Sequence, residues 1–309
     1  FETDPDTAMS RSLGYKWGKT VLDDTPFYSQ DPVTLIYSIA DLVQLTGETY
    51  YHGTVKGEEI ANYAYNYQTK KDALGGYIAS IAKTTSVYLY DSKRAFEDGV
   101  TSETAMNKSE TYKVTDIDLI DKTLSTVLDP TGPNLQSETF YKQDKGNETA
   151  DYSYNYQVGT TNIKSTSVFF YGAALERAFE TDPELAMTRS LGYKWGKTVT
   201  DATVFYNQDP VTLIYSIADL VQLTGETYYF GSIKGEEIAD YAYNYQTKKN
   251  ALDQYIASAA KTTSVYYYNS KRADDPLVTS ETAMDRSETY KTTAIGSIVR
   301  TPVVAVDAN

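Results

Sequence analysis

Residues 31–51 read DPVTLIYSIADLVQLTGETYY, and residues 209–229 repeat these letters without a change. The match extends in both directions, so that residues 1–95 align without a gap on residues 179–273. Of the 95 aligned pairs 78 are identical, which is more than a repeated apolar face alone would require. A long fixed period is typical of repeated units that pack against their neighbours. It predicts how the chain is organised and indicates no particular chemistry.

A shorter repeat lies within the long one. The start DTAMSRSLGYK recurs three more times in diverged form, whereas the later signature YNYQ occurs three times in all. Four starts and three ends predict two A-type repeats, one diverged repeat and one partial repeat. These are repeat A (1–95), repeat B (96–178), repeat A′ (179–273) and partial repeat B′ with its tail (274–309).

The spacing of apolar residues in the repeated segment favours an α-helix over 31–47. Apolar side chains recur at helical intervals from Leu35 to Val43, and Asp31-Pro32 and Gly47 stand where a helix would begin and end. The same spacing predicts helices over 209–225 and 117–128.

A longer helix is expected over 58–96, with Leu74 and Ile78 among its apolar positions. Gly75-Gly76 of repeat A become Asp253-Gln254 in repeat A′, and a turn that required positive φ would resist this exchange. The expected fold class is therefore mainly α with short β hairpins, with an α+β mixture possible.

An all-β repeat is the alternative fold. In repeat B, YSYNYQ and IKSTSVFFY flank VGTTN and resemble two strands around a turn, since Thr, Tyr and Val are strand formers. The segments LGYKWGKTV and GETYYHGTVKGEE are the most strand-like pieces of repeat A, and short hairpins are expected there.

The composition argues against several classes of function. A net charge of −14 and a pI near 4.6 disfavour nucleic acid as a partner, because phosphate binding needs clustered Lys and Arg. No apolar stretch approaches the ~20 residues that span a bilayer, so membrane insertion is not expected. Cysteine is absent, which removes thiolate metal ligands, cysteine nucleophiles and disulfides.

No catalytic or cofactor motif stands out in the sequence. The only histidine, His52, is replaced by Phe230 in the second copy, which excludes a repeated histidine site at that position. Glu58-Glu59 and Glu236-Glu237 are expected at helix starts, where negative charge offsets the helix dipole. We therefore expect a protein that is not an enzyme and that has no metal site and no cofactor.

Aromatic residues are the strongest candidates for function. The chain has 30 tyrosines against 9 phenylalanines and 2 tryptophans, and a tyrosine buries its ring while keeping a polar tip. The tyrosine clusters predict an interface or a ligand platform, and each tryptophan is expected to be the buried anchor of a turn. The candidates are Tyr63, Tyr65, Tyr67, Tyr88, Tyr90, Tyr241, Tyr243, Tyr245, Tyr266, Tyr268, Trp17 and Trp195.

Two functions fit these observations. The first is a structural scaffold, extracellular or at the cell surface, that assembles with itself or with other protein subunits in a filament, layer or large complex. The incomplete repeat B′ would leave an apolar edge for a neighbouring molecule. The second is a binding module with two equivalent tyrosine-rich pockets for a sugar or a pigment. The expected assembly tail consists of Ile298, Val299, Val303, Val304 and Val306.

Overall fold

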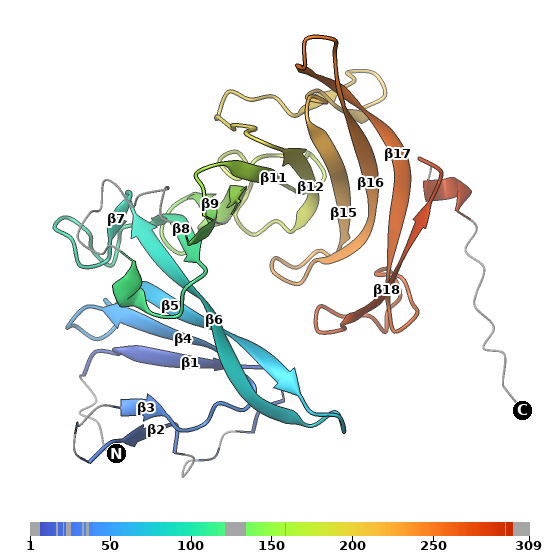
Figure 1. The fold of residues 1–309 in the computed structure, drawn as a ribbon. Coiled ribbons are helices and arrows are strands. Elements are labelled where there is room, and N and C mark those ends of the chain that lie inside the picture. Colours follow the sequence, from blue (N-terminus) through green and yellow to red (C-terminus); the bar gives the residue numbers. More distant parts are fainter. Residues whose placement is uncertain are drawn as a thin grey trace, which may run out of the picture. The chain divides into compact units, whose positions relative to one another are not determined.

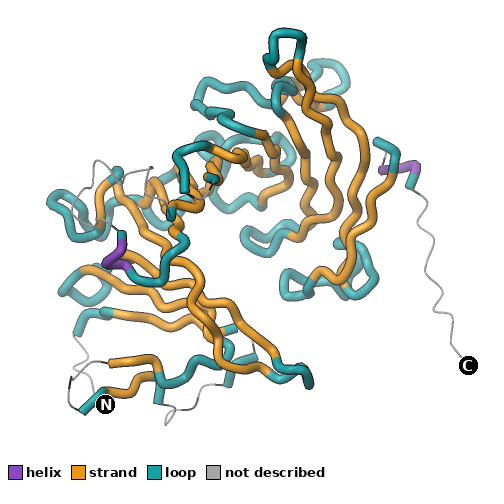
Figure 2. The backbone as a smooth tube through the Cα atoms, in the orientation of Figure 1, coloured by secondary structure: helices purple, strands orange, loops and turns teal. Residues whose placement is uncertain are grey.

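The protein is built of β-strands throughout the part of the chain that the structure describes (Figures 1 and 2). A computed structural model describes residues 7–16, 18–20, 22, 26–32, 34, 37–120, 134–157, 159–293 and 295–298. Two short 3₁₀ helices occur among these residues and no α-helix does. The expectation of a mainly α fold is therefore wrong, and the all-β alternative is correct.

The chain divides into two compact units, which are described separately. Unit 1 comprises Phe1–Glu148 and Asn155–Asn162, and unit 2 comprises Thr149–Tyr154 and Ile163–Asn309. The division into four repeats that the sequence suggests remains a prediction.

Unit 1 contains an antiparallel sheet and a separate small hairpin. The sheet has the order β1 (Arg11–Tyr15), β4 (Leu45–His52), β5 (Ile60–Lys71), β6 (Tyr77–Tyr90), β8 (Met106–Tyr112) and β9 (Leu135–Lys142). The short β7 (Lys93–Arg94) pairs with β6. The hairpin consists of β2 (Tyr28–Gln30) and β3 (Tyr37–Ile39), and a 3₁₀ helix, η1, spans Ile117–Leu119.

Unit 2 repeats this plan. Its sheet has the order β10 (Thr149–Tyr156, the last two residues counted with unit 1), β11 (Ile163–Tyr171), β12 (Met187–Lys194), β15 (Leu223–Phe230), β16 (Ile238–Lys249), β17 (Tyr255–Tyr268) and β18 (Met284–Tyr290). The small hairpin is β13 (Tyr206–Gln208) with β14 (Tyr215–Ile217), and η2 spans Ile295–Ser297.

The two A-type repeats pair their strands in the same register. Tyr50 on β4 lies opposite Tyr63 on β5, and Tyr228 on β15 lies opposite Tyr241 on β16. Both pairs are followed by a bulge at the next residue of the first strand. Since register decides which side chains share a face of the sheet, identical register places equivalent residues of the two repeats on the same face.

The long helix expected over 58–96 is instead the β5–β6 hairpin. The tyrosines of YAYNYQ alternate with smaller or polar residues, and this period of two places them on one face of a strand. Gly75 in the turn has a φ of 83°, and Asp253 at the equivalent position has a φ of 61°. Aspartate tolerates this left-handed region better than most residues. The exchange of glycine for aspartate therefore did not exclude a turn.

The other expected helices are also absent from the described residues. In segment 209–225 the Asp209 carboxylate accepts the backbone N–H groups of Val211 and Thr212, which stabilises a turn before β14. Val211 is 88% exposed, so the apolar spacing marks no buried helix face. Segment 31–47 forms β3 and the start of β4, and Leu35 lies outside the described residues. In segment 117–128 only η1 is described, apart from Ile120.

The paired glutamates that were expected at helix starts lie in turns between strands. Glu59 accepts the backbone N–H groups of Met9 and Gly57, both at 2.7 Å, and the bond from Met9 is the main reason that the pKa of Glu59 is lowered. Glu237 accepts Met187 N at 2.8 Å in the same way. Glu59 therefore ties the β4–β5 turn to the residues just before β1. Glu237 ties the β15–β16 turn to the first residue of β12.

The two strands expected in repeat B are present, but LGYKWGKTV of the second copy forms no hairpin of its own. In repeat B the two predicted strands are β10 and β11, and Gln157 N donates to Asn162 O at 3.0 Å across their turn. The strand-like segment GETYYH belongs to β4, and LGYK ends β12 in the second copy.

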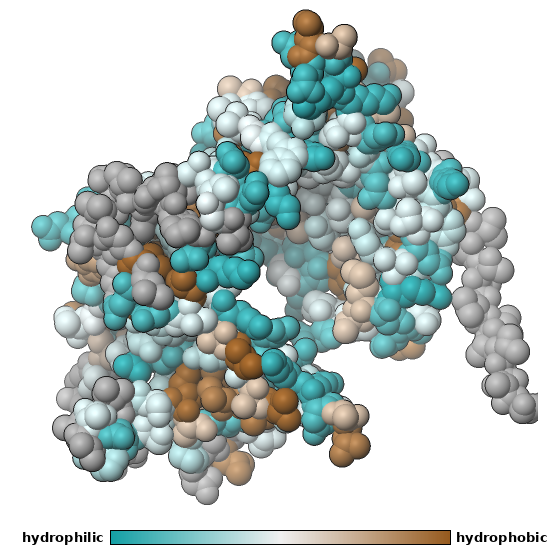
Figure 3. All heavy atoms as spheres, in the orientation of Figure 1, coloured by the Kyte–Doolittle hydropathy of each residue, from teal (hydrophilic) through white to brown (hydrophobic). Residues whose placement is uncertain are grey.

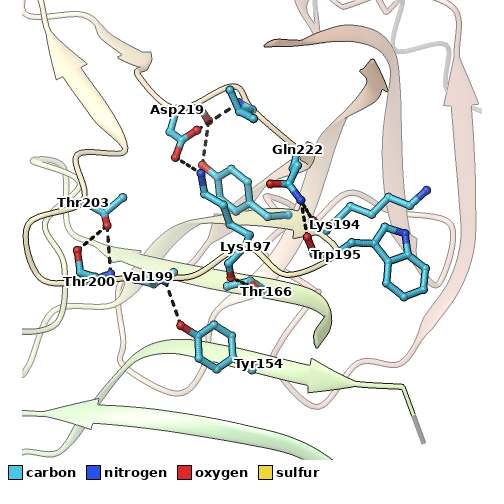
Figure 4. A network of polar contacts seen from close by, with 12 residues as sticks. Tyr154, Thr166, Lys194, Trp195, Lys197, Val199, Thr200, Thr203, Asp219 and Gln222 are labelled. Carbon is cyan, nitrogen blue, oxygen red and sulfur yellow. Dashed lines mark hydrogen bonds and ion pairs between the residues drawn. The ribbon is translucent and has the colours of Figure 1, made fainter. Parts of the chain in front are cut away.

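The core of unit 2 lies between its sheet and the segment 195–222. Buried side chains from β11, β12 and β15 pack against Val199 and Phe205 of this segment. Polar contacts fix the segment in place (Figure 4): Lys197 pairs with Asp219, and Tyr193 Oη donates to Asp219 O at 3.0 Å. The small hairpin β13–β14 is carried by this segment and is therefore held against the sheet.

Trp195 is not the buried anchor that the sequence suggests. Its ring projects away from the Lys197–Asp219 contact in Figure 4 and is 39% exposed. Trp17 lies outside the described residues. In the described part of the chain, no helix has the length and apolarity to cross a membrane.

Candidate ligand-binding cleft

Strand alternation gathers the tyrosines of repeat A′ on one face of the sheet. Tyr241, Tyr243 and Tyr245 are two residues apart on β16 and therefore point to the same side. On β15, Tyr228 lies opposite Tyr241 and Glu226 lies opposite Tyr243. Directly opposite residues of neighbouring strands share a face, so the carboxylate stands among the phenol rings.

The rings form an ordered cluster with an arginine. Tyr228 and Tyr241 stack with their centroids 4.4 Å apart and their planes at 14°, and Tyr243 meets Tyr228 edge-on at 5.6 Å. The Arg189 guanidinium lies 4.5 Å from the centre of the Tyr228 ring. Stacked and edge-on pairs and a cation over a ring are the favourable geometries for these groups.

Repeat A contains the same cluster with almost the same dimensions. Tyr50 and Tyr63 stack at 4.5 Å with their planes at 12°, and Tyr65 meets Tyr50 edge-on at 5.7 Å. The guanidinium of Arg11 lies 4.7 Å from the Tyr50 ring centre. The cluster is thus a property of the repeat and not of one copy.

Glu226 is the buried charge of the cluster, with 4% of its surface exposed. Its Oε1 accepts the Tyr206 hydroxyl at 2.7 Å and lies 3.3 Å from Arg189 Nη1. Burial, followed by the carboxylate, raises the pKa of Tyr206, and burial raises the pKa of Tyr245 to about 12. Tyr206 and Tyr245 are therefore neutral hydrogen-bonding groups at physiological pH.

A cleft of about 480 Å³ opens beside this cluster, between β14 and the β15–β16–β17 part of the sheet. Its volume falls within the roughly 300–1,000 Å³ of small-molecule sites. The lining residues are Tyr215, Ser216, Ile217, Leu220, Glu226, Tyr228, Tyr243, Tyr245, Ser258, Ala260 and Thr293.

Every lining residue has an identical residue at the equivalent position of the first copy. Repeat A differs from repeat A′ elsewhere, for example at Gly75-Gly76 against Asp253-Gln254. The equivalent residues are Tyr37, Ser38, Ile39, Leu42, Glu48, Tyr50, Tyr65, Tyr67, Ser80, Ala82 and, just beyond repeat A, Thr115.

One serine in the cleft wall is buried without a hydrogen-bond partner for its hydroxyl. Ser258 is 6% exposed and Ser80 is 5% exposed, and neither Oγ has a partner among the described residues. Their backbone N–H groups do have partners: Ser258 N donates to Leu220 O and Ser80 N donates to Leu42 O, each at 2.8 Å. An unsatisfied buried hydroxyl costs about 1–3 kcal/mol. Its presence in both copies is therefore an unusual feature that calls for a functional explanation.

The structure brings together some of the candidate residues from the sequence and separates others. Tyr243 and Tyr245 line the cleft and Tyr241 belongs to the ring cluster beside it, and Tyr63, Tyr65 and Tyr67 occupy the equivalent positions of repeat A. Tyr88 and Tyr266 directly follow Val87 and Val265, which lie opposite Tyr63 and Tyr241, so these two tyrosines point to the other face of the sheet.

The remaining candidates lie away from the cleft. Tyr90 and Tyr268 pack in small clusters with Ile60 and Ile238, and their hydroxyls donate to the backbone O of Ala61 and Ala239. Trp195 is not among the lining residues. Ile298 is 9% exposed and thus buried on its own chain, and Val299, Val303, Val304 and Val306 lie outside the described residues.

Sequence reasoning missed the polar members of the cleft. Glu48 and Tyr50 are two residues apart in GETYY, a spacing that puts both on one face of a strand. This signal was available within a segment already regarded as strand-like. Ser258 carried no comparable signal, because a single serine in a strand is ordinary until its partners are known.

Among the residues that the structure describes, no three His, Asp or Glu side chains form a group that could hold a metal ion. No protein-family model and no curated protein matches this sequence. The functional interpretation therefore depends on the geometry of the cleft and on its repetition.

Proposed function

We propose that the protein is a non-enzymatic binding module in which repeats A and A′ each offer one tyrosine-lined cleft to a small ligand. The observation that carries this proposal is the complete identity of the cleft-lining residues in the two copies. The unpartnered serine hydroxyl in both copies supports it. The site has the composition of a ligand pocket, with ring faces for contact and a few fixed polar groups for orientation.

The cluster beside the cleft is organised before any ligand arrives. Tyr228 on β15 lies between Tyr241 on β16 and Arg189 on β12, and Arg189 also pairs with Glu226. Side chains that are already fixed lose little conformational entropy on binding. Even modest contacts in such a cleft can therefore give measurable affinity.

Calorimetric titration tests the proposal with two classes of probe, the neutral oligosaccharide cellohexaose and a carotenoid added from ethanol. We expect at least one probe to bind with a stoichiometry of two. Tyr50→Ala and Tyr228→Ala should each remove one site, and the double variant should bind nothing. Tyr229→Ala is the matched control, because its hydroxyl contacts Ser190 on the other face of the sheet.

Two outcomes would contradict the binding module. The first is that neither class of probe binds the parent protein. The second is that binding persists undiminished in the variant that lacks both Tyr50 and Tyr228. Circular dichroism of each variant establishes that the β-sheet is retained.

Assembly with other protein subunits is a second proposal, favoured by a different observation. The tips of the β5–β6 and β16–β17 hairpins are hydrophobic spots on the surface (Figure 3), and Leu74 and Leu252 there are 96% and 77% exposed. Sedimentation velocity at rising concentration tests this role. If the particle size grows with concentration, and the double variant Leu74→Ser with Leu252→Ser abolishes this growth, the result would support a scaffold. A single monomeric species at all concentrations would contradict self-assembly.

A further inference from the structure

We infer that the ligand of the two clefts is a neutral carbohydrate, an inference that rests on the proposed binding function. A pyranose ring presents a face of C–H bonds and a rim of hydroxyl groups. The cleft offers the complement of both: half-buried tyrosine rings for the face, and a carboxylate and a serine hydroxyl for the rim.

The carboxylate in the cleft wall has one oxygen left for a ligand. Both contacts of Glu226 with Tyr206 and Arg189 use Oε1. In repeat A, Oε1 of Glu48 likewise accepts from Tyr28 at 3.2 Å and lies 3.7 Å from Arg11, and Tyr50 is a further hydrogen-bonding neighbour of this carboxylate. A carboxylate accepts through both oxygens, so Oε2 can accept a hydrogen bond from a ligand hydroxyl.

The serine supplies the second polar contact. A hydroxyl both donates and accepts, and that of Ser258 does neither among the described residues although the side chain is buried in the cleft wall. A ligand hydroxyl would satisfy it, and the unsatisfied group would disfavour any ligand that lacks a hydrogen-bonding partner.

The charges around the cleft select against anionic ligands. The Arg189 guanidinium already pairs with Glu226 and lies over the Tyr228 ring. Among the described residues, none of those that line the cleft is a lysine or an arginine, while the chain as a whole carries a net charge of −14. An acidic ligand would meet the Glu226 carboxylate and a repulsive field.

A purely apolar pigment fits the cleft less well than a sugar does. It would cover the remaining oxygen of Glu226 and the hydroxyl of Ser258 without offering either a hydrogen bond. Burying polar groups in this way is unfavourable. The residues that line the cleft therefore favour a ring with hydroxyl groups over a hydrocarbon.

The decisive experiment compares stability with affinity in the variant Ser80→Ala with Ser258→Ala. Removing an unsatisfied hydroxyl should leave the urea midpoint of the free protein unchanged or raised. The same variant should bind cellohexaose, maltohexaose or xylohexaose, whichever binds the parent protein best, about tenfold more weakly at both sites. Ser264→Ala is the matched control, since Ser264 Oγ accepts from Asn244 at 2.9 Å on the other face of the sheet.

The outcomes separate this inference from the proposed function. Carotenoid binding at two sites that require Tyr50 and Tyr228, without binding of any saccharide, would leave the binding module standing and overturn the carbohydrate. Tighter binding of hexagalacturonate than of the neutral sugars would overturn neutrality. Unchanged saccharide affinity in the double serine variant would overturn the role of the serine in recognition. Failure of every probe would overturn both the ligand class and the function.

Discussion

The buried arginine of repeat A tests how the repeats are stabilised. Arg94 is 1% exposed, and its Nε and Nη2 donate to Oδ1 of Asn62 at 3.2 and 2.8 Å, while Nη1 has no partner in the described part of the chain. Arg272, at the equivalent position of repeat A′, donates to the Asp240 carboxylate at 2.8 and 2.6 Å. Burial lowers the pKa of Arg94. Its charge thus lacks the carboxylate partner that the second copy supplies.

Replacing Asn62 by aspartate keeps the shape of the side chain and supplies the missing negative charge. Hydrogen bonds to charged groups contribute about 1.5–3 kcal/mol, against about 0.5–1.5 kcal/mol for neutral ones. After the desolvation of the new carboxylate is subtracted, Asn62→Asp should raise the free energy of unfolding of unit 1 by about 1 kcal/mol. Asp240→Asn is the matched reverse change and should destabilise unit 2 by about as much.

Hydrogen exchange followed by mass spectrometry measures this effect in each unit separately. A gain of about 1 kcal/mol slows the exchange of the most protected amides about fivefold. We expect this slowing in β5 and β6 for Asn62→Asp, and faster exchange in β16 and β17 for Asp240→Asn. Unchanged or faster exchange in Asn62→Asp would show that Arg94 needs no carboxylate and would refute the reasoning.

Other regions of the chain give further expected outcomes. Glu237→Ala removes the acceptor of Met187 N and should lower the free energy of unfolding by about 1 kcal/mol in a urea titration; an unchanged midpoint would contradict this role. Leu74→Ser should change stability by no more than about 0.5 kcal/mol, because the side chain is 96% exposed; a larger loss would show that the hairpin tip is packed. Burial raises the pKa values of Tyr63 and Tyr245 to about 12. Since tyrosines of the unfolded chain ionise near pH ~10, stability should be full below that pH and fall as the pH rises toward 12. The measurement is the urea midpoint as a function of pH, recorded together with tyrosinate absorbance. A midpoint that stayed constant across that pH range would contradict the expected loss of stability.

The sequence predicted the repetition of the chain but not its secondary structure. The repeated segment LTGETYY forms equivalent strands, β4 and β15, and the alternation in YSYNYQ correctly indicated β10. The segment DPVTLIYSIADLV misled because its apolar residues recur at helical intervals, whereas the structure leaves Val211 88% exposed and its neighbour Leu213 64% exposed. Apolar residues at helical intervals indicate a helix only when they form a buried face, and these residues do not. The exchange of Gly75 for Asp253 misled for a local reason, since both residues adopt positive φ.

The candidate site was predictable only in part. Tyr65 and Tyr67 were found because they repeat at short spacing within one strand. Glu48 and Ser80 belong to neighbouring strands, and their proximity to these rings depends on pairing and register, which a single sequence does not specify. Repetition helped to find these residues, but the strand pairing was needed to show that their counterparts in repeat A′ line one cleft.

The most direct test of the central claim is a nuclear magnetic resonance titration of tyrosine-labelled protein with the best-binding neutral hexasaccharide. The account predicts that ring signals from both clefts shift together, with those of Tyr50 and Tyr228 the most affected. Signals of Tyr88 and Tyr266, which point to the other face of the sheet, should stay in place. Shifts confined to one copy, shifts at Tyr88 and Tyr266 instead, or no shifts at saturating saccharide would contradict two equivalent carbohydrate-binding clefts.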